Sequence, residues 1–100
     1  MKIFAVIRTR GIVWQPALPL EQQPDWNTHA DFMNALVSDN FVLLGGPLEG
    51  TPDVLLIVRA ANEEEVIRRL EADPRTASGQ LQTARITPWD LRLGTLPGSQ

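Results

Sequence analysis

The sequence predicts an α+β fold in which two helices cover one face of a four-stranded antiparallel sheet. Four short apolar runs alternate with two segments that carry helix-start signals, in the order β, α, β, β, α, β. Because crossover connections are right-handed in almost all proteins, this order gives the ferredoxin-like βαββαβ arrangement.

The first predicted strand covers residues 2–8, KIFAVIR, and a long connection follows it. Three prolines and a glycine resist regular structure in residues 9–26, so we expect a loop over the surface. The loop is too apolar for a solvent-exposed linker, and we expect it to fold back onto the body of the protein. Its apolar residues are Ile12, Val13, Trp14, Leu18 and Leu20.

The first predicted helix runs from Trp26 or Thr28 to Asp39. Asp25 or Thr28 is its expected cap, since Thr28 followed by Asp31 resembles a capping box.

The rest of the chain also divides into predicted strands, turns and a helix, and the start of this second helix is well marked. Asn62 with Glu65 three residues later predicts the start of the second helix, and its acidic first turn suits the helix dipole. We expect a single domain over residues 1–94 and a loose tail over residues 95–100. The expected elements are a strand at 41–46, a hairpin connection at 47–52, a strand at 53–60, a helix at 63–72, a turn at 73–79 and a strand at 81–93.

Both faces of the predicted sheet are apolar. In the first strand Phe4 and Val6 alternate with the equally apolar Ile3, Ala5 and Ile7, and the run DVLLIVRA repeats this pattern. Two helices cover only one face, and the other face would expose a larger apolar patch than a monomer normally shows. The sequence therefore predicts a homodimer packed through its sheets.

The composition excludes several classes of function. Nine Lys and Arg against twelve Asp and Glu give a net charge of −3, which argues against nucleic acid or an anionic membrane as a partner. The absence of cysteine excludes disulfides, a thiolate nucleophile and a cysteine-ligated metal. A single histidine is a poor start for a zinc site, so we expect no metal and no cofactor. The apolar run at the start of the chain is too short for the core of a signal peptide, and we expect a cytoplasmic protein.

His29, the one histidine of the chain, falls on the same helical stripe as Phe32, Met33 and Leu36. Two interpretations stay open. An imidazole titrates near neutral pH and suits a general acid or base, while a core histidine with both nitrogens hydrogen-bonded is the simpler alternative.

Asp73, in the stretch ADPRTASG, also has two interpretations. An aspartate before proline is a good turn starter, and a carboxylate near His29 would orient the imidazole and stabilise its protonated form. The topology places the start of the first helix near the turn after the second helix, so the two residues are expected to be neighbours.

The remaining candidates are glycines and tryptophans. Gly45, Gly46 and Pro47 lack the Lys-Ser/Thr of a phosphate loop, and we expect them to permit a turn or the close approach of a ligand. The tryptophans, Trp14, Trp26 and Trp89, would either wall a pocket for a flat organic molecule or fill a small core.

Over residues 26–93 the chain resembles the YCII-related proteins, which are small dimeric α+β barrel proteins. The resemblance rests on HADFMNALVSDNFVLLGGP, on DVLLIVRAANEEEVIRRLEADP and on GQLQTARITPW. It implies an acid/base dyad of His29 and Asp73 in a cleft, with Gly46 and Pro47 beside it. A relative is similar to enzymes that remove chloride from hydroxylated aromatics.

Two departures from the family pattern bear on the substrate. Arg75 stands where family members have an aromatic residue, which changes the polarity of the pocket or admits an anionic substrate. The proline-rich residues 15–24 form an expected lid, so the substrate is not inherited from the family.

Two functions follow from these observations. The first is a cofactor-free lyase, isomerase or dehydrochlorinase-like enzyme for a small organic molecule, with His29 moving a proton and Asp73 holding its ring. Its substrate-binding candidates are Arg8, Trp14, Trp26, Gly46, Pro47 and Arg75, with Arg8 near the end of a strand to stabilise developing negative charge. The second is a non-catalytic homodimer that binds a small molecule or acts as an accessory domain.

Overall fold

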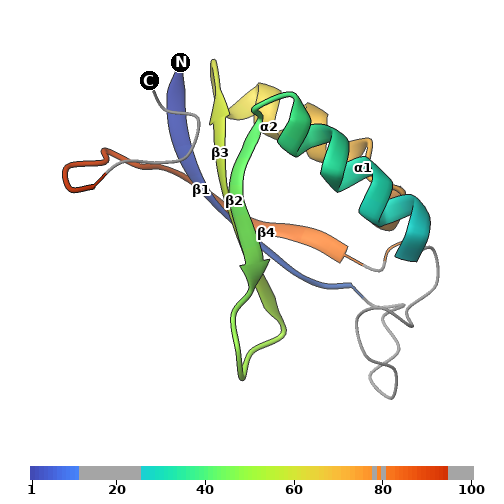
Figure 1. The fold of residues 1–100 in the computed structure, drawn as a ribbon. Helices are drawn as coiled ribbons and strands as arrows, with labels where there is room; N and C mark the ends of the chain where they lie inside the picture. The colour runs from blue at the N-terminus through green and yellow to red at the C-terminus, as the bar shows by residue number, and fades with distance from the viewer. Residues whose placement is uncertain (12–25, 78, 80, 95–100) are drawn as a thin grey trace.

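A computed structural model describes residues 1–11, 26–77, 79 and 81–94. Its elements follow the predicted order, with one short helix in addition (Figure 1). They are β1 (Lys2–Arg10), α1 (Trp26–Ser38), β2 (Val42–Pro47), β3 (Asp53–Ala60), α2 (Glu63–Glu71), α3 (Pro74–Ala77) and β4 (Leu81–Pro88).

The four strands form one antiparallel sheet in the order β2-β3-β1-β4. Figure 1 shows the sheet nearly edge-on, with α1 and α2 on the same side of it. The predicted α+β, ferredoxin-like βαββαβ fold is therefore confirmed.

The core lies between the sheet and the helices. Alternate residues of β1 point into it, and Phe4 and Val6 pair across the sheet with Val58 and Leu56 of β3. α1 contributes Leu36 to this core and α2 contributes Val66 and Leu70. Burial of these side chains, each contributing about 1.5–3 kcal/mol, holds the helices against the sheet.

The capping signal of α2 is confirmed in its main feature. The Asn62 side chain accepts a hydrogen bond from the Glu65 backbone N–H at 2.9 Å, and Glu65 Oε1 accepts one from the Ala61 N–H at 2.7 Å. α1 begins at Trp26, the first of its two predicted starts, and Thr28 lies inside its first turn. Thr28 is therefore not its cap, and Asp25 lies outside the described residues.

Three differences from the prediction are larger than a shift of one residue at the end of an element. β1 continues to Arg10, because its last residues pair with β4. The stretch after Asp73 is the short helix α3 and not only a turn. β4 ends at Pro88 and not at residue 93, because proline has no N–H to continue a strand ladder. The expected tail at 95–100 lies outside the described residues, as do residues 15–24.

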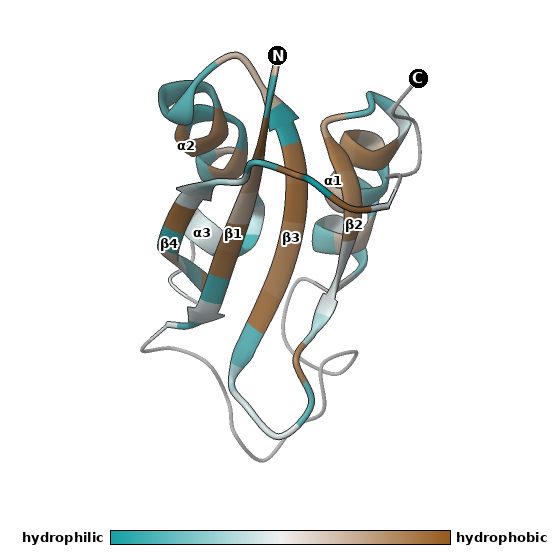
Figure 2. Ribbon diagram, turned by 90° about the vertical axis from the view of Figure 1, so that its left-hand side faces the viewer, coloured by the Kyte–Doolittle hydropathy of each residue, from teal (hydrophilic) through white to brown (hydrophobic). Residues whose placement is uncertain are grey.

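Figure 2 views the sheet from the side opposite the helices, here called the outer face, and shows mainly apolar residues along β1 and β3. Ile3, Ala5 and Ile7 of β1 and Leu55 of β3 are all partly accessible on it. After β4 the chain stays near this face, and the Trp89 N–H donates to the Ile3 carbonyl at 2.8 Å. Trp89 is 41% exposed, so this tryptophan does not fill the core.

No helix among the described residues is both long enough and apolar enough to cross a bilayer. The same residues contain no group of three or more His, Cys, Asp or Glu side chains suited to hold a metal ion.

Candidate active site

His29 lies in the first turns of α1, on the side of the helix that packs toward the sheet. Phe32 and Met33 of the same stripe pack against the core, and Leu36 is part of it. The side chain of His29 is 13% exposed, so most of the imidazole is shielded from water while part of it stays accessible.

Asp73 occupies the junction between α2 and α3, and its side chain is completely buried. The Arg75 backbone N–H donates to Asp73 Oδ1 at 3.0 Å, and the Thr76 N–H donates to the Asp73 carbonyl at 2.9 Å. Asp73 therefore caps α3, which is the local role that an Asp-Pro sequence predicts.

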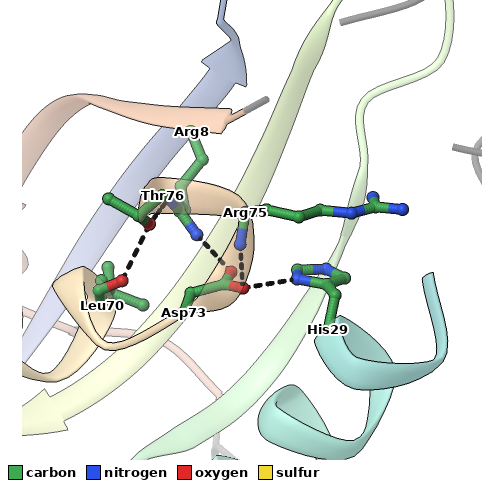
Figure 3. Close-up of polar contacts among 6 residues, drawn as sticks. All are labelled: Arg8, His29, Leu70, Asp73, Arg75 and Thr76. Carbon is green, nitrogen blue, oxygen red and sulfur yellow. Dashed lines mark hydrogen bonds and ion pairs between the residues drawn. The ribbon is translucent and has the colours of Figure 1, made fainter. Parts of the chain in front are cut away.

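The structure brings His29 and Asp73 together. His29 Nδ1 lies 2.9 Å from Asp73 Oδ1, although the two residues are 44 positions apart in the sequence (Figure 3). An ionised carboxylate only accepts hydrogen bonds, so Nδ1 carries the proton in this contact. In the neutral ring the basic lone pair is then on Nε2.

Arg8 completes this cluster from β1. Its Nη1 donates to Asp73 Oδ2 at 2.8 Å, and its Nη2 donates to Thr76 Oγ1 (Figure 3). The Thr76 hydroxyl in turn donates to the Leu70 carbonyl at 2.9 Å. The guanidinium is thereby fixed between the end of α2 and the start of α3, and only 2% of Arg8 is exposed.

The charges of the cluster determine the state of Asp73. Burial raises the pKa of this carboxyl, but hydrogen bonds from His29 and the Arg75 N–H, together with the charges of His29 and Arg8, outweigh it. The pKa of Asp73 therefore lies below its ordinary value, and the carboxylate is ionised at neutral pH. Burial lowers the pKa of Arg8, and the Asp73 charge opposes this effect.

A pocket of about 220 Å³ lies between α1 and the sheet beside this cluster. Arg8, His29 and Asn34 supply its polar groups, and the rest of its wall is mainly apolar. The other lining residues are Met33, Val37, Val42, Gly45, Gly46, Pro47, Val54, Leu56 and Leu81. Its size suits a molecule smaller than the drug-sized ligands that occupy pockets of about 300–1,000 Å³.

Gly45 shapes this pocket. A Cβ added at Gly45 would lie 2.6 Å from Leu56 Cδ2, whereas one added at Gly46 would meet nothing within 4 Å. The present packing of Leu56 against β2 therefore requires that residue 45 has no side chain.

A larger hollow of about 620 Å³ lies between α2 and β4. It is lined by Thr76 but by none of Arg8, His29 and Asp73. We place the candidate site in the smaller pocket, because a titratable side chain held by a buried carboxylate faces it.

No protein-family model matches the chain, and no curated protein has a significantly similar sequence. A solved structure with a similar fold is that of 5-chloro-2-hydroxyhydroquinone dehydrochlorinase from Burkholderia phenoliruptrix AC1100, in complex with 2,5-dihydroxybenzoquinone. The match covers 92% of this chain and 95% of the dehydrochlorinase, with a TM-score of 0.63 and 22% sequence identity. The two proteins share a fold.

The other site residues predicted from the sequence fall into three groups: some line the pocket, one is buried, and the side chains of two lie outside the described part of the structure. Gly46 and Pro47 line the pocket, as does Arg8. Arg75 is completely buried, and Figure 3 shows its guanidinium extending past the His29 ring. Trp14 and the side chain of Trp26 lie outside the described residues.

Two participants were not predicted from the sequence. Thr76 binds Arg8, and Asn34 lines the pocket from α1. The spacing of Asn34 on α1, five residues after His29, carries a weak signal, while an isolated threonine such as Thr76 carries none.

Proposed function

We propose that this protein is a cofactor-free enzyme that moves a proton on a small organic molecule bound between α1 and the sheet. His29 is the proposed acid and base, and Asp73 holds its ring. The contact of His29 Nδ1 with the buried Asp73 carboxylate, beside a small apolar pocket, is the observation that carries the proposal.

The chemistry follows from the proton on Nδ1. In the proposed reaction Nε2 accepts a proton from an acidic C–H or O–H group of the substrate, and Asp73 stabilises the imidazolium that forms. In an isomerase the proton returns to another atom of the substrate. In a lyase the electron pair of the broken C–H bond forms a double bond as a leaving group, such as chloride, departs.

The pocket supports a flat substrate with one polar edge. Its apolar walls favour a ring or a short carbon skeleton, and Arg8, His29 and Asn34 give it a polar end. The protein of similar fold is a dehydrochlorinase bound to a dihydroxybenzoquinone, a molecule of this kind. We extend the proposal to membership of the YCII-related proteins, on the residues that resemble that family.

We also propose that a second copy of the chain covers the outer face. The partly accessible residues Ile3, Ala5, Ile7 and Leu55 and the exposed Leu44 give this face an apolar surface. A second sheet would remove that surface from water.

A thermal-shift screen of small phenols, quinones, lactones and carboxylates tests whether the pocket binds such molecules. We expect at least one compound to raise the melting temperature of the wild type. The same compound should have a smaller effect on His29→Gln, and Glu64→Gln, an exposed change on α2, is the matched control.

Failure of every compound class to shift the wild type would contradict the proposed function. Equal shifts in the wild type and in His29→Gln would favour a binding protein in which His29 is structural.

A further inference from the structure

We propose that Arg8 is a positioning residue that controls the protonation of His29 through Asp73. This inference rests on the proposed role of His29 as an acid and base and extends it to a residue of β1. The sequence placed Arg8 beside the substrate, whereas the structure also binds its guanidinium to Asp73.

The two carboxylate oxygens of Asp73 have different hydrogen-bond partners. Oδ2 accepts from Arg8, and Oδ1 accepts from the Arg75 backbone N–H and faces His29 Nδ1. With Oδ2 held at 2.8 Å by a guanidinium, the carboxylate has little freedom to rotate. Arg8 therefore keeps Oδ1 directed at the imidazole.

Thr76 fixes Arg8 in turn. The threonine hydroxyl accepts from Arg8 Nη2 and donates to the Leu70 carbonyl at 2.9 Å. A chain of hydrogen bonds thus runs from the last turn of α2 through Thr76, Arg8 and Asp73 to His29 (Figure 3).

The positive charge of Arg8 also acts on the protonation of His29. A buried Asp73 paired with His29 alone would hold an imidazolium strongly, and a ring that is already protonated is a poor base. The positive charge of Arg8 balances Asp73, and the buried Arg75 guanidinium also extends past the His29 ring (Figure 3), so protonation of His29 adds a further positive charge to the cluster. Arg8 therefore favours the neutral imidazole and helps the imidazolium to give its proton back.

A purely structural role is the alternative for Arg8. Arg8 pairs with Val54 across the sheet, on the face where Phe4 and Val6 are buried in the core. Replacing a buried ion pair with well-packed apolar residues is often neutral or stabilising, so stability alone is a weak reason for an arginine here. Its contact with the carboxylate that binds His29 gives a more specific reason.

The test uses the fact that the chain has one histidine. In a full-length sample labelled with ¹⁵N-histidine, long-range ¹H–¹⁵N correlation spectra report the tautomer and protonation of His29 alone. In the wild type we expect the neutral ring to carry its proton on Nδ1. Arg8→Gln keeps a hydrogen-bond donor but removes the charge, and Arg8→Lys keeps the charge.

In Arg8→Gln the midpoint of the His29 titration should move up, because the variant lacks a positive charge that opposes protonation of the imidazole. Arg8→Lys should restore the midpoint to within about half a unit of the wild type, since its charge remains near Asp73. Arg85→Gln, a change on the exposed part of β4, is the control and should not move it.

An unchanged midpoint in a folded Arg8→Gln variant would overturn the inference. If that variant does not fold, Thr76→Val decides, because it removes one contact of Arg8 and preserves side-chain shape. A wild-type tautomer and midpoint in Thr76→Val would then overturn the inference, and an upward shift with a mixture of tautomers would support it.

These spectra need neither ligand nor turnover. A failed ligand screen with a shifted midpoint would therefore refute the proposed function alone. A productive screen with an unchanged midpoint would refute only the role of Arg8.

Discussion

Asp73 Oδ2 and Arg8 Nη1 lie 2.8 Å apart in the interior of the domain, although the two residues are 65 positions apart in the sequence. This contact ties β1 to the junction of α2 and α3, and the other oxygen of Asp73 faces His29 on α1. One carboxylate thereby connects three parts of the fold, and its loss should affect both stability and the candidate site.

Replacing Asp73 with Asn should destabilise the protein by about 3–5 kcal/mol at pH 7, because Arg8 is left as a buried charge without its carboxylate partner. Chemical denaturation of the two proteins measures the difference. Asp90→Asn is the matched control, since Asp90 and its partner Arg92 are largely exposed and such pairs contribute little.

The effect of Asp73→Asn should depend on pH. The pKa of Asp73 is lower in the folded protein than its ordinary value, so its ionised form stabilises the fold above about pH 4. This contribution is lost as the pH falls through the folded-state pKa. The stability difference from Asp73→Asn should therefore shrink below about pH 4, and a constant difference down to pH 2 would contradict the assigned charge state.

The two glycines of β2 offer a matched pair of pocket variants. Gly45→Ala places a methyl group 2.6 Å from Leu56 Cδ2, so the leucine must move within the pocket wall. We expect a loss of stability on the order of 1 kcal/mol and weaker binding of any screening hit. Gly46→Ala meets nothing within 4 Å, and its stability should stay within about 0.5 kcal/mol of the wild type.

Melting temperatures with and without the hit compounds measure both effects. Equal ligand-induced shifts in Gly45→Ala and Gly46→Ala would show that the ligand binds elsewhere.

The outer face predicts the behaviour of the protein in solution. Light scattering should give twice the 11.1 kDa mass of one chain if a second sheet covers the outer face as we propose. Leu55→Glu introduces a charge into that face and should dissociate the dimer. Ile67→Glu changes a residue of α2 that is 40% exposed, and it should leave the dimer intact. A wild-type mass of one chain at micromolar concentration would contradict the covered face.

The fold was largely predictable from the sequence because its signals are local. The run of residues 53–60 is β3 as expected, and Asn62 with Glu65 marks the start of α2. α3 was missed because its four residues, PRTA, are too few for a helical pattern. The last strand was extended too far because Trp89, Leu91 and Leu93, beyond Pro88, alternate with polar residues as a strand does.

The site was less predictable, for a physical reason. The neighbourhood of His29 and Asp73 follows from topology, since it needs only the order of the helices and strands. The contact of Arg8 with Asp73 depends on the rotamer of a long side chain and on Thr76, and no periodicity or motif encodes either. The sequence therefore placed Arg8 among the site residues but did not indicate its contact with Asp73.

The proposed function requires His29 to move a proton on a molecule bound in the pocket. The direct measurement is ¹H NMR of screening hits in D₂O with wild type and His29→Gln, following exchange or loss of an acidic proton of the ligand. The wild type should accelerate this reaction by about 10²–10⁴-fold over His29→Gln, the usual contribution of a general acid or base. Bound compounds that react at the same rate with both proteins, and no faster than in buffer, would contradict the claim.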